Sequence, residues 1–413
     1  MSLEKLRNEL KECKYGRLLL QFLSFLYLLA LKCRYFLYDN EFLKPASSGV
    51  PVICFGNIST GGTGKTSMAI LTAIELKKSG HNPAVLIRGY KRTRSSASPV
   101  ALCGPGPFSI RDTGDEAMML YNLLNPHSIP VIVGPDRIKT GKLALNLFKS
   151  DVLLLDDGFQ NFSIKKDLKI ILINAGMPFE NEKLLPMGNL REPKYRLKTA
   201  DIIILTHVER TSQKNLDTLK QEIVKFNRNS RTAAEQRASG GTAALRPQVS
   251  EAMPTTSSSV GRYATRPTGV GGYADDQNAP ILETVYSPEC FIDAFTMKGM
   301  HPAEFKKEAA VISGIGDPGS FEENLKSLKI SLRQAWRYPD HHFFTVEEMT
   351  AIETARHYLP LITTHKDFVR FPENWREIFK TEVYIFSAKI QFLLDGYRIL
   401  MNAITEQIAN NKK

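Results

Sequence analysis

Cysteine is scarce in this chain of 413 residues, and its placement excludes two classes of protein. The five cysteines are odd in number, widely spaced and without a CxxC pair: Cys13, Cys33, Cys54, Cys103 and Cys290. Such a set predicts neither a disulfide framework nor a structural zinc site, and it fits a reducing cytosol best. The length allows roughly two or three domains.

Acidic residues are fewer than basic residues in this chain. The chain has 43 aspartates and glutamates against 54 lysines and arginines, which gives a net charge of +11. This balance favours anionic partners such as nucleotides, phospholipid headgroups or nucleic acids. The sequence has no RNP-like aromatic pattern, zinc finger or concentrated basic stripe, so we predict no nucleic-acid partner.

No apolar run clearly reaches the roughly 18 to 20 residues that cross a bilayer as a helix. The nearest candidate, residues 18–31, has basic residues on both sides, and no small-residue cleavage site follows it. We therefore predict that residues 1–40 form a membrane-associating region whose helix lies in the interface. A helix packed on the protein's own core and a short true span are the alternatives.

Large apolar side chains are rare over residues 231–280. Ser, Thr, Gly, Ala and Pro dominate this stretch, which contains one leucine and no isoleucine or phenylalanine. Such a composition buries too little apolar surface to offset the entropy lost on ordering. We therefore predict a disordered linker or insertion here.

The rest of the chain alternates apolar, β-rich runs with helical patterns. Buried strands are predicted at 50–55, 84–87, 131–133, 152–155, 170–173 and 202–205, with helices between several of them, as at 67–78 and 138–149. This order predicts an α/β fold with a parallel sheet covered on both faces, in a domain over residues 41–230.

The alternation resumes after the low-complexity stretch. Strands are predicted at 309–313, 332–336, 361–363 and 383–386, and helices at 321–328 and 346–358. Residues 281–413 are therefore expected to form a second, smaller α/β domain, closed by a C-terminal helix at about 390–408.

The strongest chemical signal is a P-loop pattern between the first strand and the first helix of the sheet domain. Its residues are predicted to bind the nucleotide: Ser59, Thr60, Gly61, Gly62, Thr63, Gly64, Lys65 and Thr66. Backbone N–H groups at the glycines converge on phosphate oxygens, the lysine neutralises the β- and γ-phosphates, and the final threonine hydroxyl is a ligand for Mg²⁺. The usual first glycine is replaced by serine, so the pattern is a variant.

A pair of carboxylates supplies the acidic partner that a P-loop needs for its metal ion. Asp156 and Asp157 follow the apolar run VLLL, at the carboxyl end of a predicted strand. This is where a Walker B carboxylate lies, next to the phosphate loop. Together with Thr66 they are the predicted Mg²⁺ ligands.

Three polar clusters bear on what happens to the γ-phosphate. Asp115 and Glu116 precede a helical stretch, where they would either cap the helix or supply a base for an attacking hydroxyl. His341 and His342 would serve as a base, as metal ligands or as loop residues. The pair at 191 and 192, arginine then glutamate, fits a phosphate contact or a structural ion pair equally well.

Taken together, these stretches resemble the tetraacyldisaccharide 4′-kinase family, whose members phosphorylate the 4′ position of the lipid A disaccharide precursor with ATP and Mg²⁺. The matching motifs run in family order over nearly the whole chain outside 231–280: GNISTGGTGKT, IRGYKR, GDEAMML, GPDRIKTG, LLLDDGFQN, LLPMGNLREP, ADIIILTH, YPDHHFF and TTHKDFVRF. Each motif is short, and their joint occurrence is what makes the resemblance specific.

The resemblance implies two α/β/α subdomains joined by a hinge, with a hydrophobic N-terminal helix on the membrane. It implies that Asp115 receives the proton of the 4′-hydroxyl, that His341 supports it, and that Arg191 and Glu192 belong to the nucleotide site. Asp115, His341 and Lys65 form the predicted catalytic set. Ser67 stands where the family commonly has proline, and Asn161 and His365 are further departures.

The resemblance also implies partners and a location: the lipid A disaccharide precursor as acceptor, the phospholipid surface, no obligate protein partner, and the cytoplasmic face of the bacterial inner membrane. The main alternative is a membrane-associated P-loop ATPase switch, but such proteins carry a lysine where this chain has Thr60. A non-enzymatic nucleotide-dependent scaffold is a third possibility. A GTPase is disfavoured because no clean NKxD motif is present.

Overall fold

The computed structural model describes residues 3–89, 92, 98–179, 183–238, 278–306, 308–380 and 382–411, with backbone alone at 3–5 and 227–238. Residues 239–277 of the predicted linker lie outside this range, so their predicted disorder stays a prediction. Residues 231–238 are instead the end of helix α7 (Gln213–Ala238). This corrects the predicted start of the linker: the segment RTAAEQRA is rich in good helix formers and prolongs the helix.

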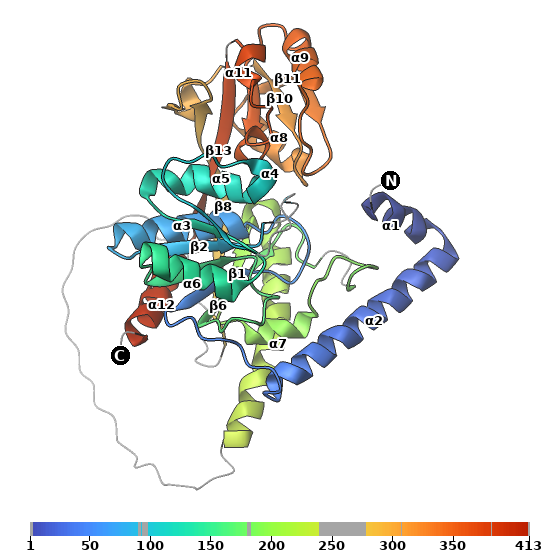
Figure 1. The fold of residues 1–413 in the computed structure, drawn as a ribbon. Helices are drawn as coiled ribbons and strands as arrows, with labels where there is room; N and C mark the ends of the chain where they lie inside the picture. Colours follow the sequence, from blue (N-terminus) through green and yellow to red (C-terminus); the bar gives the residue numbers. More distant parts are fainter. Residues whose placement is uncertain are drawn as a thin grey trace, which may run out of the picture.

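A mixed, mostly parallel sheet of 13 strands runs through both halves of the protein (Figure 1). In the larger half the order is β7-β6-β1-β5-β2-β4-β3, and only β3 is antiparallel to its neighbour. These strands are β1 (Val52–Gly56), β2 (Pro83–Ile87), β3 (Val100–Leu102), β4 (Val131–Val133), β5 (Val152–Asp156), β6 (Leu168–Asn174) and β7 (Ile202–Thr206). The predicted α/β class is confirmed.

Helices cover both faces of the larger half, which explains why its central strands are apolar along their whole length. One face packs on α3 (Lys65–Lys78), α5 (Asp115–Leu124) and α12 (Gly396–Asn410). The other face packs on α6 (Arg137–Phe148) and α7. A short helix, α4 (Ile110–Thr113), leads into α5, and 3-10 turns lie at η1 (Asn125–His127), η2 (Lys194–Thr199), η3 (Val208–Arg210) and η4 (Pro302–Glu304).

The smaller half continues the same sheet in the order β11-β10-β12-β13. Its strands are β10 (Glu308–Ser313), β11 (Ser331–Arg337), β12 (Leu361–Thr364) and β13 (Val383–Phe392), and β9 (Gly299–Met300) pairs at the side. Its helices are α8 (Pro318–Ser327), α9 (Val346–Ala355), α10 (His365–Phe368) and α11 (Trp375–Ile378). Separate apolar cores form on the two faces of this half, one beneath α9 and the other beneath α8.

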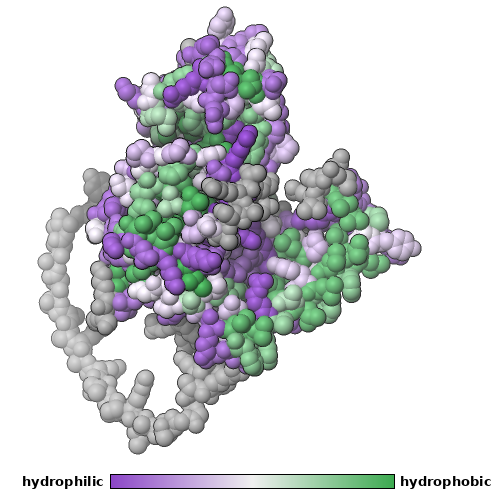
Figure 2. Space-filling model, in the orientation of Figure 1, coloured by the Kyte–Doolittle hydropathy of each residue, from purple (hydrophilic) through white to green (hydrophobic). Residues whose placement is uncertain are grey.

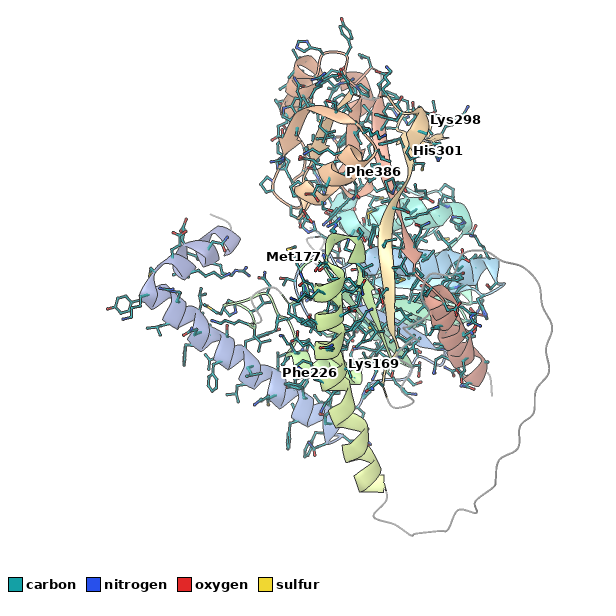
Figure 3. All side chains as sticks on the ribbon, turned by 180° about the vertical axis from the view of Figure 1, so that it is seen from behind. Lys169, Met177, Phe226, Lys298, His301 and Phe386 are labelled. Atoms are coloured by element: carbon teal, nitrogen blue, oxygen red, sulfur yellow. The ribbon has the colours of Figure 1, made fainter. Side chains whose placement is uncertain are left out.

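One long strand, β8 (Ile281–Asp293), joins the two halves. Its first residues pair in parallel with β7, and the remainder pairs antiparallel with β13. Figure 3 shows it rising from the level of Lys169 and Phe226 in the larger half to that of Lys298, His301 and Phe386 in the smaller one. The sequence patterns did not predict this strand, since Pro288 interrupts it; the register shifts there, as expected for a residue that cannot donate to the ladder.

The C-terminal helix packs differently from the prediction. We expected it to close the smaller domain, but Leu400, Ile404 and Ile408 of α12 lie in the same apolar core as Met68 and Leu76 of α3. The reason is the length of β13, which carries the chain back alongside β8 to the larger half. The predicted boundary at 281 stays a prediction, and α12 is an element of the larger half's core.

An N-terminal arm of two helices, α1 (Leu3–Glu12) and α2 (Lys14–Asp39), projects from the larger half (Figure 1). Among the described residues α2 is the one helix long and apolar enough to cross a membrane, and only 17% of its most apolar window is buried. Its outward face is apolar, as Figure 2 shows; exposed members include Leu18, Phe22, Phe25 and Leu29. This low burial argues against a helix packed on the protein's own core.

Truncating α12 tests its place in the core. Ile404 is fully buried, so we expect Ile404→Ala to lower the free energy of unfolding by about 2–5 kcal/mol. Ile399 is 39% exposed on the same helix, and Ile399→Ala should cost no more than about 0.5 kcal/mol. Urea denaturation followed by circular dichroism measures both variants. Equal small losses would contradict the packing described here.

Candidate functional site

The turn after β1 has the geometry of a phosphate-binding loop. β1 lies between β5 and β6, and the chain leaves it at Gly56 and enters α3 at Lys65. Gly61 and Gly64 have φ values of 106° and 80°, which a residue with a Cβ atom rarely adopts. The predicted loop residues therefore lie at the N-terminus of a 14-residue helix, where unpaired N–H groups attract anions.

Ser59 replaces the first glycine of the usual pattern without backbone strain. Its φ lies outside the left-handed region, so a glycine is not required there. Ser59 pairs as an antiparallel bridge with Leu190 and is 6% exposed. The variant pattern is therefore compatible with the loop geometry.

Two residues that the sequence analysis missed hold the loop from the ends of neighbouring strands. Asn174 ends β6 and donates from Nδ2 to the carbonyl of Gly62 at 3.2 Å. Thr206 ends β7 and donates from its hydroxyl to the carbonyl of Thr63, also at 3.2 Å. Their position at strand ends was the available signal, because parallel strands deliver their carboxyl ends to one edge of the sheet.

The predicted carboxylates lie directly beside this loop. The Thr66 hydroxyl donates to Oδ2 of Asp156 at 2.9 Å. Asp157 has one oxygen 3.7 Å from Nζ of Lys65 and the other 2.8 Å from Nη1 of Arg191. The structure thus brings together these five residues, which the sequence analysis had assigned to the nucleotide and its metal ion.

Asp156 lies where a cation would be stabilised. Burial, followed by the charges of Glu116 and Asp157, raises the pKa of Asp156 to about 7. Its Oδ1 atom is buried and has no hydrogen-bond partner among the described residues. One carboxylate beside one hydroxyl suits Mg²⁺, which binds through one or two carboxylates and the phosphates of its nucleotide. Within the described residues no group of three His, Cys, Asp or Glu side chains converges to hold a metal without a nucleotide.

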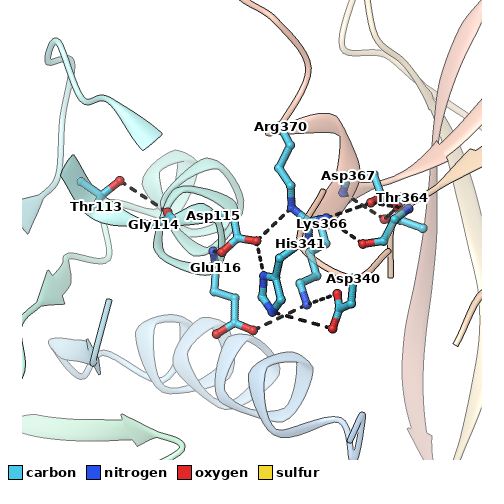
Figure 4. Close-up of polar contacts among 11 residues, drawn as sticks. Thr113, Gly114, Asp115, Glu116, Asp340, His341, Thr364, Lys366, Asp367 and Arg370 are labelled. Carbon is cyan, nitrogen blue, oxygen red and sulfur yellow. Dashed lines mark hydrogen bonds and ion pairs between the residues drawn. The ribbon is translucent and has the colours of Figure 1, made fainter. Parts of the chain in front are cut away.

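A second polar cluster forms where the two halves of the protein meet (Figure 4). Asp115 is the first residue of α5, and its Oδ2 lies 2.6 Å from Nδ1 of His341, which belongs to the loop after β11. These two residues are 226 positions apart in the chain. A carboxylate can only accept, so Nδ1 of the histidine carries the shared hydrogen.

Asp115 is not the N-cap residue of α5, which was the alternative to its role as a base. Gly114 is the N-cap residue of α5 and provides no side-chain bond. Asp115 directs one oxygen to the backbone N–H of Glu116 at 3.0 Å and the other across to the smaller half. His342 faces elsewhere, donating to Glu348 at 2.9 Å and stacking on Tyr338, so the paired histidines do not form a metal site.

Arg370, which the sequence analysis did not identify as a site residue, completes the cluster. Its Nε lies 2.9 Å from Oδ2 of Asp115, and its Nη1 donates to the Gly314 carbonyl and to Asp367. The guanidinium is fully buried. Its signals in the sequence are its place in the motif TTHKDFVRF and its spacing three residues after Asp367, and neither is specific to a functional site.

The partners of Asp115 determine its charge. Burial opposes ionisation, but the hydrogen bond from His341 and the charges of His341, Arg370 and Lys366 outweigh it and lower the pKa of Asp115 to about 2. Lys366 also lies 3.8 Å from Glu116, and the charge of Glu116 reaches Asp156. The Asp115 cluster and the phosphate loop therefore form one continuous electrostatic site.

The predicted nucleotide residues at 191 and 192 face in different directions. Arg191 turns to Asp157 at the phosphate loop. Glu192 is 1% exposed and accepts a hydrogen bond from the hydroxyl of Tyr35 on α2. Burial raises the pKa of Glu192, and the bond from Tyr35 opposes this rise. A direct role of Glu192 in nucleotide binding stays a prediction.

Comparisons with known proteins agree over nearly the full length. The family model described as tetraacyldisaccharide-1-P 4′-kinase matches residues 16–408. The tetraacyldisaccharide 4′-kinase of Elusimicrobium minutum is 36% identical over 392 residues, covering 95% of this chain and 92% of that protein. The enzyme of that name from Syntrophus aciditrophicus is 32% identical over 361 residues, covering 86% and 84%.

A solved structure gives the same result for the fold. The crystal structure of LpxK from Aquifex aeolicus, described as a complex with ATP, superposes with a TM-score of 0.65 at 26% sequence identity. The match covers 95% of this chain and 99% of that one. With the phosphate loop and the Asp115 cluster in place, this chain belongs to the tetraacyldisaccharide 4′-kinase family.

Proposed function

We propose that this chain transfers the γ-phosphoryl group of ATP to the 4′-hydroxyl of the tetraacyldisaccharide 1-phosphate precursor of lipid A, with Asp115 receiving the proton of that hydroxyl and His341 supporting Asp115. The observation that supports this assignment is the contact of Asp115 with His341 at 2.6 Å, at the start of helix α5, which packs beside α3 of the phosphate loop. Membership in the 4′-kinase family supports the reaction, and the geometry supports this choice of residues.

The nucleotide is bound by the loop from Ser59 to Thr66. Backbone N–H groups at the start of α3 hold the phosphates, and Lys65 neutralises the charge between the β- and γ-phosphates. Thr66 and Asp156 would hold Mg²⁺, which when bound neutralises developing charge on the phosphates. Arg191, fixed by Asp157, adds a second positive charge at this end of the sheet.

The transferred group passes through a loose transition state, so alignment and electrostatics carry most of the catalysis. Asp115 is ionised near neutral pH, since its pKa is lowered to about 2. Its carboxylate accepts the hydroxyl proton as the new P–O bond develops, and His341 keeps it oriented. Because a strongly acidic carboxyl is a weak base, this transfer must occur late, when the sugar oxygen has already become acidic.

We place the protein on the membrane through α2. The exposed apolar side chains of this helix suit the interfacial region, where a lipid acceptor is also found. ATP is a cytoplasmic nucleotide, so the proposed location is the cytoplasmic face of the inner membrane. A P-loop switch without phosphoryl transfer is the less favoured function, because Thr60 stands where switches have lysine and the family is one of kinases.

Removing the Asp115 carboxylate tests the proposed base. We expect Asp115→Ala to lower turnover by about 10²-fold or more with nearly unchanged ATP affinity, as is usual for loss of a general base. Transfer of radiolabel from ATP to the lipid disaccharide in detergent micelles measures it. Asp395→Ala, at a 70% exposed carboxylate far along the chain, is the control. Near-normal turnover in Asp115→Ala would remove this residue from the role.

The charge of Arg370 should be visible in the pH dependence. Arg370 helps to keep the pKa of Asp115 low, so the base is lost only when the pH falls towards about 2. Arg370→Gln removes this charge while Asp115 stays buried, so the pKa of Asp115 rises. The acid limb of the pH profile of kcat therefore moves to higher pH. Arg370→Lys, which keeps the charge, should move it less. Superimposable pH profiles for parent and Arg370→Gln would contradict this account.

The raised pKa of Asp156 predicts proton release on Mg²⁺ binding. Near its pKa of about 7 the carboxyl is partly protonated, and a cation favours the ionised form. Affinity for Mg²⁺ with a non-hydrolysable ATP analogue should therefore rise from pH 6 to pH 8. Calorimetry in buffers of different ionisation enthalpy measures the released proton. Asp156→Asn should abolish the release and Asp157→Asn should keep it; release that persists in Asp156→Asn would exclude this residue.

A further inference from the structure

The N-terminal arm contacts residues 189–192, which in turn contact the nucleotide site. We infer that α1 and α2 position the phosphate loop through residues 189–192, with Tyr35 as the principal positioning residue. The inference rests on the proposed function, since it concerns how the same site is held. It gives the arm a second role besides offering an apolar surface to the membrane.

The first set of contacts joins the arm to this loop. The hydroxyl of Tyr27 donates to the carbonyl of Arg191 at 2.8 Å, and the hydroxyl of Tyr35, two helical turns on, donates to the carboxylate of Glu192. Arg7 of α1 donates to the side-chain oxygen of Asn189 at 2.8 Å. Three positions of the loop, 189, 191 and 192, are thus held by side chains of the arm.

The second set of contacts joins the same positions to the nucleotide site. The carbonyl of Asn189 accepts from the backbone N–H of Thr60 at 2.7 Å. The backbone N–H groups of Arg191 and Glu192 both donate to the carbonyl of Ile58, at 2.7 and 3.1 Å. The Arg191 side chain pairs with Asp157 at 2.8 Å. Each residue held by the arm therefore contacts the phosphate loop, the residue that precedes it or the carboxylate beside it.

The bond from Tyr35 to Glu192 is the one that water cannot replace. Tyr35 is 5% exposed and Glu192 is 1% exposed. The second oxygen of this carboxylate is buried and has no hydrogen-bond partner among the described atoms. The Tyr35 ring is itself fixed by the guanidinium of Arg196, 4.3 Å from its centroid. Loss of the tyrosine hydroxyl would leave a buried carboxylate without this donor, which is costly and would displace the loop.

The opposite side of the same helix is free for lipid. Leu18, Phe22, Phe25 and Leu29 are all more than half exposed, whereas Tyr35 faces the protein. A displacement of α2 would therefore move residues 189–192, and through them the phosphate loop. Membrane attachment and nucleotide binding are in this way mechanically connected.

Replacing the hydroxyl alone tests the inference. Tyr35→Phe is compared with Tyr15→Phe, which removes the hydroxyl of an 82% exposed tyrosine on the same helix. Both variants should sediment with vesicles of phosphatidylethanolamine and phosphatidylglycerol as the parent does. Affinity for a fluorescent, non-hydrolysable ATP analogue with Mg²⁺ should fall about tenfold in Tyr35→Phe only, the size expected for one hydrogen bond to a charged group.

The pH dependence separates positioning of this carboxylate from a general loss of structure. The Tyr35 hydroxyl favours the ionised form of Glu192, so its removal raises the pKa of Glu192 further. As the pH is lowered, Glu192 should therefore become protonated earlier in Tyr35→Phe. Nucleotide affinity should begin to fall at a higher pH in this variant than in the parent or in Tyr15→Phe. Equal affinities and pH profiles in the two phenylalanine variants would overturn the inference, as would loss of vesicle binding in Tyr35→Phe. Absence of phosphate transfer by the parent would instead refute the proposed function, because the binding measurements need no turnover.

Discussion

The site depends on one carboxylate that is shared between the two halves of the protein. Asp115 belongs to the larger half, and the two side chains that contact its carboxylate there, His341 and Arg370, belong to the smaller half. Neither half contains the cluster alone. Because a buried carboxylate is stable only when paired, the halves must approach closely for Asp115 to remain ionised. Glu116, the residue after Asp115, is close enough to Asp156 beside the phosphate loop to help raise the pKa of that carboxyl.

The continuous sheet makes this approach reproducible. β8 and β13 are long antiparallel strands that pass from one half to the other, and α12 returns to the core beside α3. The connection is therefore a ladder of hydrogen bonds together with a packed helix, which is stiffer than a single loop. On the opposite side the N-terminal arm supports residues 189–192 beneath the phosphate loop. The site is thus held by the N-terminal arm and by the smaller half at once.

Local patterns predicted much of the fold and the nucleotide end of the site. The buried strands of the larger half were predictable because residues covered on both faces must be apolar throughout. Lys65, Thr66 and Asp156 were predictable because glycine spacing and strand ends have local causes. β8 escaped prediction because Pro288 breaks its pattern, and α12 was assigned to the wrong core because periodicity identifies a buried face without identifying what covers it.

Sequence by itself determined the α/β class, the phosphate loop, the apolar N-terminal helix and, through its motifs, the family. Only the tertiary structure decided that Arg370 joins Asp115 and that Glu192 turns to Tyr35, because these pairs are separated by 255 and 157 residues. A short motif reflects the backbone conformation that its own residues require. It carries no information on which distant side chain will neutralise a buried charge, since that depends on how the halves of the sheet are brought together.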